Sequence, residues 1–523
     1  MLNAAMGAAR RLSPKLAVAL AVIAGAALYA VAYLDPYVAL IMVPFFALGC
    51  ARGKHPLVLL ALSVLPALAL LAISNIKFFL TGLPLVTYDQ YFLRQNVLML
   101  IYNDWRVAAA AALTVGATVL YIKHLFTGRG MFSRFEKWSL TALAAASVAC
   151  ISGLHSWEYK ILQWDQELGA PSLRTFVMSS QIPRPQLHVI SPAEAAVPKV
   201  AAAPDIGLGA PAGALPDIFL VLQESTMHPA VVRPDYRPET LFAEGPLTPN
   251  GFAGPLHVHT FGGATWRTEF TIATQMRPQE FGGDGLYVFY QLEGRIKQSI
   301  FTRLKALGYR TMVFYPVPGN FINAQNFYAS IGVDEFYDPE SLGIGKGWAW
   351  KVSDATLYDA MLKKIGDSEA PVVALFLTIN QHGPHDSDDP IADYVARFAE
   401  SDSGYKGFLG ALEQRGRKAG VVTFGDHQPD FLAGHHDRSA WYSTAYDVRC
   451  VNFKCANTAL AGRGPKPLDL VMLVPLALEE FGFKLDGFSA LERHLYRDCD
   501  DDITRCSEAT RLEVNTAFAK YFE

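Results

Sequence analysis

The chain has no excess of positive charge and contains little cysteine. Its 523 residues carry a formal net charge of −4, which gives no reason to expect a nucleic-acid partner. The six cysteines form no Cys-x-x-Cys pair, which disfavours a cysteine-ligated zinc site. Four of them lie in two close pairs, Cys450/Cys455 and Cys499/Cys506. Two local disulfides in an oxidising compartment are the favoured interpretation, and two reduced pairs are the alternative.

Charged residues are scarce in the first 155 residues, where Ala, Leu and Val dominate, and the composition then changes to that of a globular enzyme. This change predicts at least two domains. Several apolar stretches approach the roughly 20 residues of a bilayer-spanning helix. They are residues 16–34, 37–50, 56–73, 107–122 and 138–151. We therefore predict an all-α transmembrane bundle of about five helices over residues 1–155.

The basic residues of this segment indicate its orientation. They precede the first predicted span, or lie between the second and third spans or between the fourth and fifth. The positive-inside rule places those loops in the cytoplasm, and the further spans argue against a cleaved signal peptide. We expect a multi-pass protein of the bacterial inner membrane. Residues 156–216 are predicted to be a helical connector and an Ala/Pro/Gly-rich linker, and residues 217–523 a periplasmic catalytic domain.

Four short apolar runs in the second half are each followed by reactive side chains. Their composition is typical of strands buried on both faces of a parallel sheet, and such sheets bind ligands at the carboxyl ends of their strands. The runs cover residues 218–223, 311–314, 372–379 and 420–424. Glu224, Tyr315, the Asn380-Gln381-His382 sequence and the Gly425-Asp426-His427 sequence follow them in that order. We expect these residues to meet at one edge of the sheet.

Two of these strand ends offer metal ligands. Asp426 and His427 can give a carboxylate and an imidazole to one ion, with an ordinary loop pair as the alternative. Glu224 is either a further ligand or a solvated residue at the end of a strand.

Thr265 follows Gly262 and Gly263, which permit a tight turn before a helix. The free N–H groups and dipole of that helix would face an anion. Thr265 is therefore an N-cap, a nucleophile activated by a divalent metal, or both. His382 and His385 flank Gly383-Pro384. We favour His382 over a purely structural histidine for protonating a leaving oxygen or holding a phosphoryl oxygen.

Together these segments resemble the alkaline phosphatase/sulfatase superfamily, in particular the membrane-anchored lipoteichoic acid synthases and osmoregulated-glucan phosphoglycerol transferases. The segments that carry the resemblance are Glu224-Ser225, residues 262–270, residues 299–338, the His382 turn and Gly-Asp-His-Gln-Pro at 425–429. The resemblance implies an α/β domain with a central, mostly parallel sheet. It also implies that Glu224, Thr265, Asp426 and His427 bind one divalent metal (Mn, Zn or Mg) and that Thr265 is the nucleophile. A true sulfatase is disfavoured, because no Cys/Ser-x-Pro-x-Arg motif surrounds Thr265.

The chain departs from this family pattern where the head group would bind. Family members resembling lipoteichoic acid synthase have His at the position of Tyr315 and Trp-x-Arg at residues 322–324, where this chain has Ile-Asn-Ala. Either another arginine such as Arg267 supplies the missing charge, or the head group differs. The candidate substrate-binding residues are Arg267, Tyr315, Asn320 and His385.

The resemblance implies transfer of a phospholipid head group, phosphoglycerol being favoured, to a periplasmic glycan such as an osmoregulated glucan through a phosphothreonine intermediate. The expected partners are a membrane phospholipid, a periplasmic polysaccharide and the bilayer. A phosphoethanolamine transferase and a membrane-bound phosphodiesterase or phosphatase are the alternatives. An inactive sensor would lack metal ligands, whereas all four are present.

Overall fold

The protein, described here from a computed structural model, divides into two compact units, Met1–Pro183 and Arg184–Glu523, each treated by itself. Apart from Phe176, Leu460 and shorter stretches between residues 38 and 89 and from 489 onward, the residues described are 105–127, 133–153, 207–243, 250–345, 352–367, 369–386, 388–434, 442–458 and 466–487.

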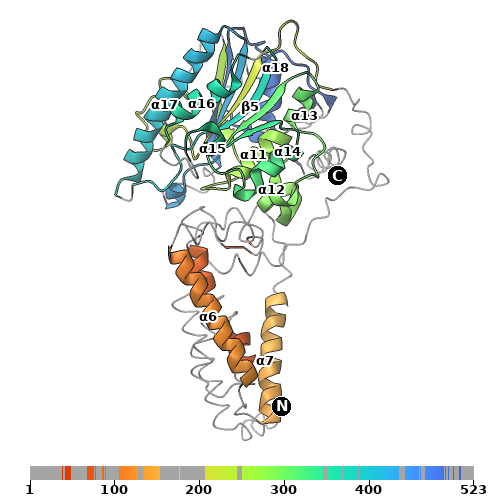
Figure 1. The fold of residues 1–523 in the computed structure, drawn as a ribbon, viewed down its shortest axis with the longest axis vertical. Helices are drawn as coiled ribbons and strands as arrows, with labels where there is room; N and C mark the ends of the chain where they lie inside the picture. The colour runs from red at the N-terminus through yellow and green to blue at the C-terminus, as the bar shows by residue number, and fades with distance from the viewer. Residues whose placement is uncertain are drawn as a thin grey trace. The chain divides into compact units, whose positions relative to one another are not determined.

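The first unit contains two long helices where the fourth and fifth spans are predicted. These are α6 (Trp105–Thr127) and α7 (Arg134–Gly153), shown in Figure 1. The first predicted span lies outside the described residues, and only parts of the second and third lie within them. Within the described residues, no helix combines the length and the apolarity needed to cross a membrane.

The second unit is built on an eight-stranded sheet of order β4-β3-β5-β1-β6-β7-β2-β8. The five strands from β4 to β6 run parallel, whereas β7 is antiparallel to both β6 and β2. The strands are β1 (Asp217–Gln223), β2 (Gly251–His257), β3 (Arg310–Phe314), β4 (Glu335–Tyr337), β5 (Val372–Leu377), β6 (Ala419–Gly425), β7 (Ser443–Val451) and β8 (Leu468–Asp469). The predicted mostly parallel central sheet is confirmed.

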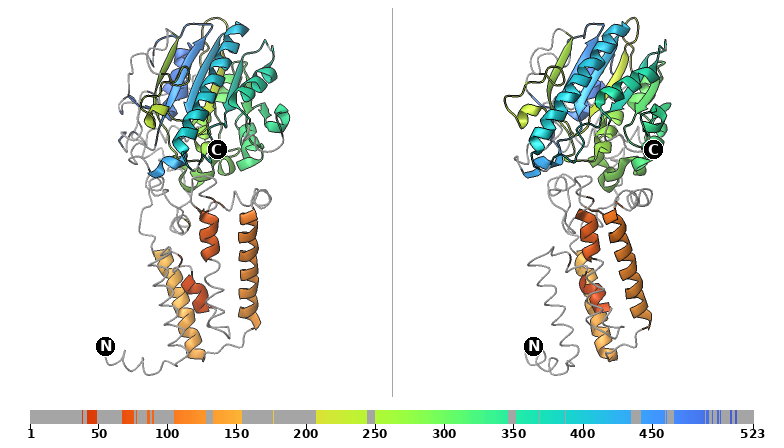
Figure 2. Two further views of the ribbon diagram at one scale, coloured as in Figure 1. Left: turned by 90° about the vertical axis from the view of Figure 1, so that its left-hand side faces the viewer. Right: turned by 60° about the vertical axis from the view of Figure 1, so that its left-hand side comes forward.

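Helices cover both faces of this sheet (Figure 1). On one face, Tyr358 of α16 stacks on Phe376 of β5 and on Phe408 of α17, with ring centroids 4.8 and 4.6 Å apart. On the other face, Phe481 at the end of α18 lies against Gly420 of β6, and α11 packs on α18. The turned views in Figure 2 show α17, in cyan, lying across its face of the sheet. The helices are α11 (Thr265–Thr274), α12 (Val288–Gln291), α13 (Ile300–Lys305), α14 (Ala324–Ser330), α15 (Pro339–Leu342), α16 (Asp354–Ile365), α17 (Pro390–Arg415) and α18 (Leu470–Glu480).

The four apolar runs of the sequence form β1, β3, β5 and β6, and β1 lies between β5 and β6. Every residue of β1, β5 and β6 is buried, as expected for strands covered on both faces. The other strand bounds differ from the runs by at most one residue, whereas β5 ends at Leu377 rather than at Ile379. The Asp354 carboxylate accepts hydrogen bonds from the amides of Ile379 and Asn380, at 3.3 and 3.2 Å, so these amides turn away from the ladder.

Part of the predicted linker packs on the second unit. Gly209 forms a two-way backbone bridge with Lys484, with N···O distances of 2.8 and 2.9 Å. Cys450 is joined to Cys455 and Cys499 to Cys506 by disulfides, in agreement with the favoured interpretation of the sequence. Both bonds close short loops within the C-terminal part of this unit.

Gly425, the last residue of β6, provides a test of the packing at the end of the sheet. A Cβ atom at this position would lie 1.7 Å from the carbonyl oxygen of Thr226, so backbone must move to admit it. We expect Gly425→Ala to destabilise the full-length protein by about 3 kcal/mol, the upper range for overpacking. Thermal unfolding of detergent-solubilised protein, followed by tryptophan fluorescence, measures the change.

Gly407→Ala is the matched control, because Gly407 lies within α17 and a Cβ there meets nothing within 4 Å. Alanine is the better helix former by about 0.5–1 kcal/mol, so this variant should be as stable as wild type or more stable. Equal unfolding temperatures for the two variants would contradict the packing at Gly425.

Candidate active site

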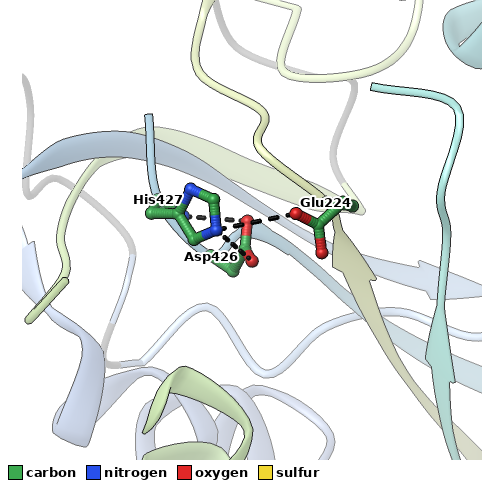
Figure 3. A group of neighbouring side chains, drawn as sticks. All are labelled: Glu224, Asp426 and His427. Carbon is green, nitrogen blue, oxygen red and sulfur yellow. Dashed lines mark hydrogen bonds and ion pairs between the residues drawn. The ribbon is translucent and has the colours of Figure 1, made fainter. Parts of the chain in front are cut away.

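The parallel pairing of β1 with β6 brings Glu224 beside Asp426 and His427. Gln223 is in register with Gly425, so the residues that follow the two strands leave the sheet side by side. Glu224, Asp426 and His427 are buried, and each offers one ligand atom within 4.8 Å of the others (Figure 3). This group, called the metal-binding cluster below, could hold a metal ion.

Asp426 places one carboxylate oxygen in a backbone cradle and leaves the other facing the cluster. Its Oδ1 accepts hydrogen bonds from the amides of Ser225, at 2.7 Å, and His427, at 2.8 Å. Its Oδ2 is buried and has no hydrogen-bond partner, although it lies 3.2 Å from Nε2 of His427. A buried acceptor without a donor, beside a second carboxylate, is the arrangement that a bound cation would satisfy.

Burial disfavours charge on both carboxylates of the cluster. It raises the pKa of Asp426 to about 7, against the opposing effect of the hydrogen bonds donated to it. It also raises the pKa of Glu224, and the negative charge of Asp426 raises it further, whereas the imidazoles of His382 and His427 oppose the shift. A divalent ion would favour the ionised form of both groups.

His427 presents its Nε2 atom to the cluster. Its Nδ1 lies 2.9 Å from the carbonyl oxygen of Gln428, and a carbonyl only accepts, so Nδ1 carries the proton of that hydrogen bond. Nε2 lies 3.5 Å from Oε1 of Glu224. A backbone carbonyl that fixes the tautomer in this way is typical of metal-binding histidines.

Thr265 is the first residue of α11, and its side chain contacts the cluster. Its Oγ1 donates to Oε2 of Glu224 at 3.1 Å and lies 3.4 Å from Nε2 of His427. The turn before the helix is left-handed, with φ of 67° at Gly262 and 65° at Ala264. Because a non-glycine residue is strained there by about 1–3 kcal/mol, the surrounding structure must impose this backbone on Ala264.

Two hydrogen bonds fasten the α11 segment to the β6 segment. The amide of Gly262 donates to the carbonyl oxygen of Gln428 at 3.0 Å, and Oγ1 of Thr268 donates to that of Asp426 at 2.9 Å. The predicted nucleophile and the predicted ligands are therefore held by one backbone network. The structure brings Glu224, Thr265, Asp426 and His427 together.

His382 lies on the turn that follows β5. Its Nδ1 lies 2.7 Å from the carbonyl oxygen of Gly383 and so carries the proton of that bond. Nε2 is then the ring nitrogen that does not carry this proton. The opposing effect of His382 on the pKa of Glu224 reflects the proximity of the ring to that carboxylate.

Tyr315 contacts a buried acid rather than the cluster. Its hydroxyl donates to Oε1 of Glu269 at 3.3 Å, and that of Tyr328 donates to Oε2 at 2.5 Å. Glu269 lies on α11 one turn after Thr265 and is 1% exposed. Burial raises its pKa to about 8 despite the two phenols, so this acid is largely protonated at neutral pH.

The other candidate substrate-binding residues occupy different surroundings. Arg267 is buried in the first turn of α11, and Asn320 is exposed at the start of the 3₁₀ helix Phe321–Asn323. The ring of His385 packs edge-on against Phe431 and Tyr394, with centroids 4.9 and 5.9 Å away. Burial lowers the pKa of His385, which favours the neutral ring.

Sequence reasoning missed the residues that support this site. Tyr328 donates to Glu269 and the amide of Ser225 donates to Asp426, and neither role is evident from the sequence. Asp354 lies on α16, before β5, and Arg397 lies on α17, after the His382 turn that both residues bind; neither belongs to a recognised motif. The one signal available was the four-residue spacing of Asp393, Arg397 and Ser401, which places them on one face of a helix.

Residues 216–450 match the model of the Sulfatase family. The chain thus contains a sulfatase/alkaline phosphatase superfamily domain.

Its relatives include the lipoteichoic acid synthase-like protein YvgJ of Bacillus subtilis, 25% identical over 182 residues, which are 32% of this chain and 29% of YvgJ. A Rhizobium meliloti protein named for cyclic beta-1,2-glucan modification is 24% identical over 237 residues, 41% of this chain and 36% of the relative. Among solved structures, the Streptococcus pyogenes phosphoglycerol transferase GacH gives a TM-score of 0.45 at 17% identity, covering 59% of this chain and 86% of GacH. The chain matches less than half the length of the curated relatives.

Removal of a ligand tests the metal-binding cluster. At a metal concentration about 100 times Kd, a bound ion adds about 2.7 kcal/mol to stability. We expect Mn, Zn or Mg to raise the unfolding temperature of wild type by this mechanism, and Asp426→Asn to lose the increase together with the bound metal measured by mass spectrometry. Asp359→Asn, an exposed change on α16, should behave like wild type. Undiminished metal binding by Asp426→Asn would remove Asp426 from the cluster.

The buried acid Glu269 predicts a pH dependence of stability. Its pKa is raised from 4.5 to about 8 in the folded protein, so between these values the folded state binds more protons than the unfolded state. Stability contributed by protonated Glu269 is therefore complete below about pH 4.5 and is lost as pH rises through about 8. We expect the unfolding temperature of metal-free wild type to fall between pH 5 and pH 8 by several degrees more than that of Glu269→Gln, which cannot ionise. Parallel curves for the two proteins would show that Glu269 is not held neutral.

Proposed function

We propose that the protein is a metal-dependent phosphotransferase that moves a phospholipid head group to a glycan through a phosphothreonine at Thr265. The observation that supports this most strongly is the position of the Thr265 hydroxyl, 3.1 Å from Oε2 of Glu224 and 3.4 Å from Nε2 of His427, at the N-terminus of a helix. A threonine with only a structural role has no need to lie among two buried carboxylates and an imidazole, whereas a nucleophile that must be activated does.

Glu224, Thr265, Asp426 and His427 would hold one divalent ion. The donor set of two carboxylates, one imidazole and one hydroxyl suits Mn, Zn or Mg. Such an ion would supply charge stabilisation to the phosphoryl group and would lower the pKa of the Thr265 hydroxyl.

In the first step, the Thr265 hydroxyl gives up its proton to solvent and its Oγ1 attacks the phosphorus of the donor in line. The bond from phosphorus to the lipid oxygen breaks, and His382 gives its proton to that oxygen, so diacylglycerol leaves. In the second step, an acceptor hydroxyl attacks the phosphothreonine, His382 takes the proton of that hydroxyl, and Oγ1 of Thr265 is released. The free N–H groups at the start of α11 stabilise negative charge on the phosphoryl oxygens throughout.

Phosphoglycerol is the favoured head group and a periplasmic glucan the favoured acceptor. Two relatives support this choice, one named as lipoteichoic acid synthase-like and one for cyclic glucan modification. Phosphoethanolamine is the alternative head group, because Tyr315 bonds to Glu269 where the related enzymes have a histidine. A phosphodiesterase or phosphatase would use the same residues with water as acceptor.

We also propose that residues 1–155 anchor the enzyme in the bacterial inner membrane, that residues 156–216 connect, and that residues 217–523 act in the periplasm. The sorting of basic residues among the apolar stretches supports this orientation. The two disulfides are consistent with an oxidising compartment. An anchor would keep the site close to a lipid donor.

Intact-protein mass analysis tests the nucleophile. After incubation with phosphatidylglycerol or phosphatidylethanolamine and metal, wild type should gain the mass of one head group, and the donor that gives the adduct identifies the head group. We expect Thr265→Ala to gain none and to retain no measurable transfer, since the bond to phosphorus cannot form. Thr271→Ala, which removes a buried hydroxyl of the same helix, is the control and should still form the adduct.

Addition of a periplasmic glucan separates transferase from hydrolase. If the adduct is lost only when glucan is present, and labelled glucan is the product, the result supports the transferase. Loss at the same rate without glucan supports the hydrolase. An adduct that persists in Thr265→Ala would contradict the assignment of the nucleophile.

A further inference from the structure

The turn that carries His382 is held by one face of α17. Asp393, Arg397 and Ser401 are spaced by four residues on this helix and therefore lie along one stripe. Each of them makes hydrogen bonds to the turn or to a residue that binds it. The turn is thus positioned by side chains from a helix that contributes no predicted catalytic residue.

Arg397 makes most of these contacts. Its Nη1 donates to the carbonyl oxygens of Asn380, at 3.4 Å, and His382, at 3.0 Å, and its Nη2 donates to that of Pro384 at 3.1 Å. The carbonyl group of His382 and one on either side of it therefore bind the same guanidinium. Only the planar fork of arginine carries enough donors for this pattern.

The amide side of the same turn is bound by Asp354 of α16. Its Oδ1 accepts from the amides of Ile379 and Asn380, and its Oδ2 accepts from Oγ of Ser401 at 2.6 Å. Asp354 is 2% exposed, and the amide group of Asn380 donates to the carbonyl oxygen of Arg397 at 3.0 Å. Amide groups and carbonyl groups of the turn are thus both hydrogen-bonded to side chains of α16 and α17.

Asp393 completes the frame. It pairs with Arg397 one turn later on α17, at 2.8 Å, and its Oδ2 accepts from the amide of Asp386 at 3.1 Å. The pair fixes the direction of the guanidinium, so that its remaining N–H groups point at the carbonyl groups of the turn.

We propose that Arg397 is a positioning residue for His382: it fixes the backbone of the 380–384 turn so that the imidazole meets the leaving oxygen. This inference rests on the proposed function, in which His382 protonates that oxygen. A misplacement of about 1 Å can reduce a rate by about 100-fold, so a loosened turn should be visible in the chemistry even when the fold is intact.

The test compares two donors that differ in their leaving groups. Diacylglycerol leaves as an alcohol and needs a proton, whereas the p-nitrophenolate of a glycerol phosphate p-nitrophenyl diester leaves as a stable anion. The first step is measured alone, by adduct formation with phosphatidylglycerol under single-turnover conditions and by the burst of p-nitrophenolate. General acid catalysis contributes typically about 10²–10⁴-fold, so His382→Ala should lose that much with the lipid and little with the aryl donor.

Arg397→Met should show the same selectivity with a smaller loss, about 10- to 100-fold with the lipid donor. Combining it with His382→Ala should add no further loss, because both changes remove the same proton transfer. Arg397→Lys keeps the charge beside Asp393 but lacks the fork, so an intermediate loss is expected. This second variant carries the test if Arg397→Met folds poorly.

Arg415→Met is the matched control. Arg415 lies at the end of the same helix and likewise donates to a backbone carbonyl, that of Gly366, but it does not contact the His382 turn. It should leave both reactions unchanged. Equal losses with the two donors in Arg397→Met and Arg397→Lys would show a general structural role and overturn the proposal. Absence of both the adduct and the burst in wild type would overturn the proposed function together with it.

Discussion

The arrangement of the site follows from two carboxylates, Glu224 and Asp426, that are buried next to each other. Their closeness is a consequence of strand register, because Gln223 of β1 pairs with Gly425 of β6 and the chain leaves the sheet at both points at once. Burial and mutual repulsion disfavour their charges, and one oxygen of Asp426 is left without a donor. Two such groups are stable together only when protons or a cation compensate them. The side chains of Thr265 and His427 lie against these two groups.

Thr265 and His427 complete this compensation from different elements. The left-handed backbone before α11 and the hydrogen bonds from Gly262 and Thr268 to the β6 segment place the Thr265 hydroxyl against Glu224. The hydrogen bond from Nδ1 of His427 to Gln428 turns Nε2 toward the same point. The site is therefore a meeting of three backbone segments, and none of them could form it alone.

The region around Tyr315 contains a buried acid that lies outside the metal-binding cluster. A buried acid, Glu269, is bonded to two phenols, and its raised pKa keeps it largely neutral at physiological pH. A histidine at this position would bring a second titratable group to the same acid. The acid lies on the same helix that carries Thr265.

The sequence by itself determined the four central strands, their parallel arrangement and the identity of the residues at their carboxyl ends. Continuous apolar runs followed by Glu224, His382 and Asp426-His427 are compatible with few other structures, since strands buried on both faces must lie inside a sheet. It did not show β2, whose glycines and proline disguise a strand, or β8, which has two residues. Only the tertiary structure decided which residues hold the site in place. Tyr328 contacts Glu269 from 59 residues away, whereas Asp354 and Arg397 bind Ile379 and His382 from 25 and 15 residues away. Helix packing against the sheet brings these residues together, and no local pattern encodes such contacts.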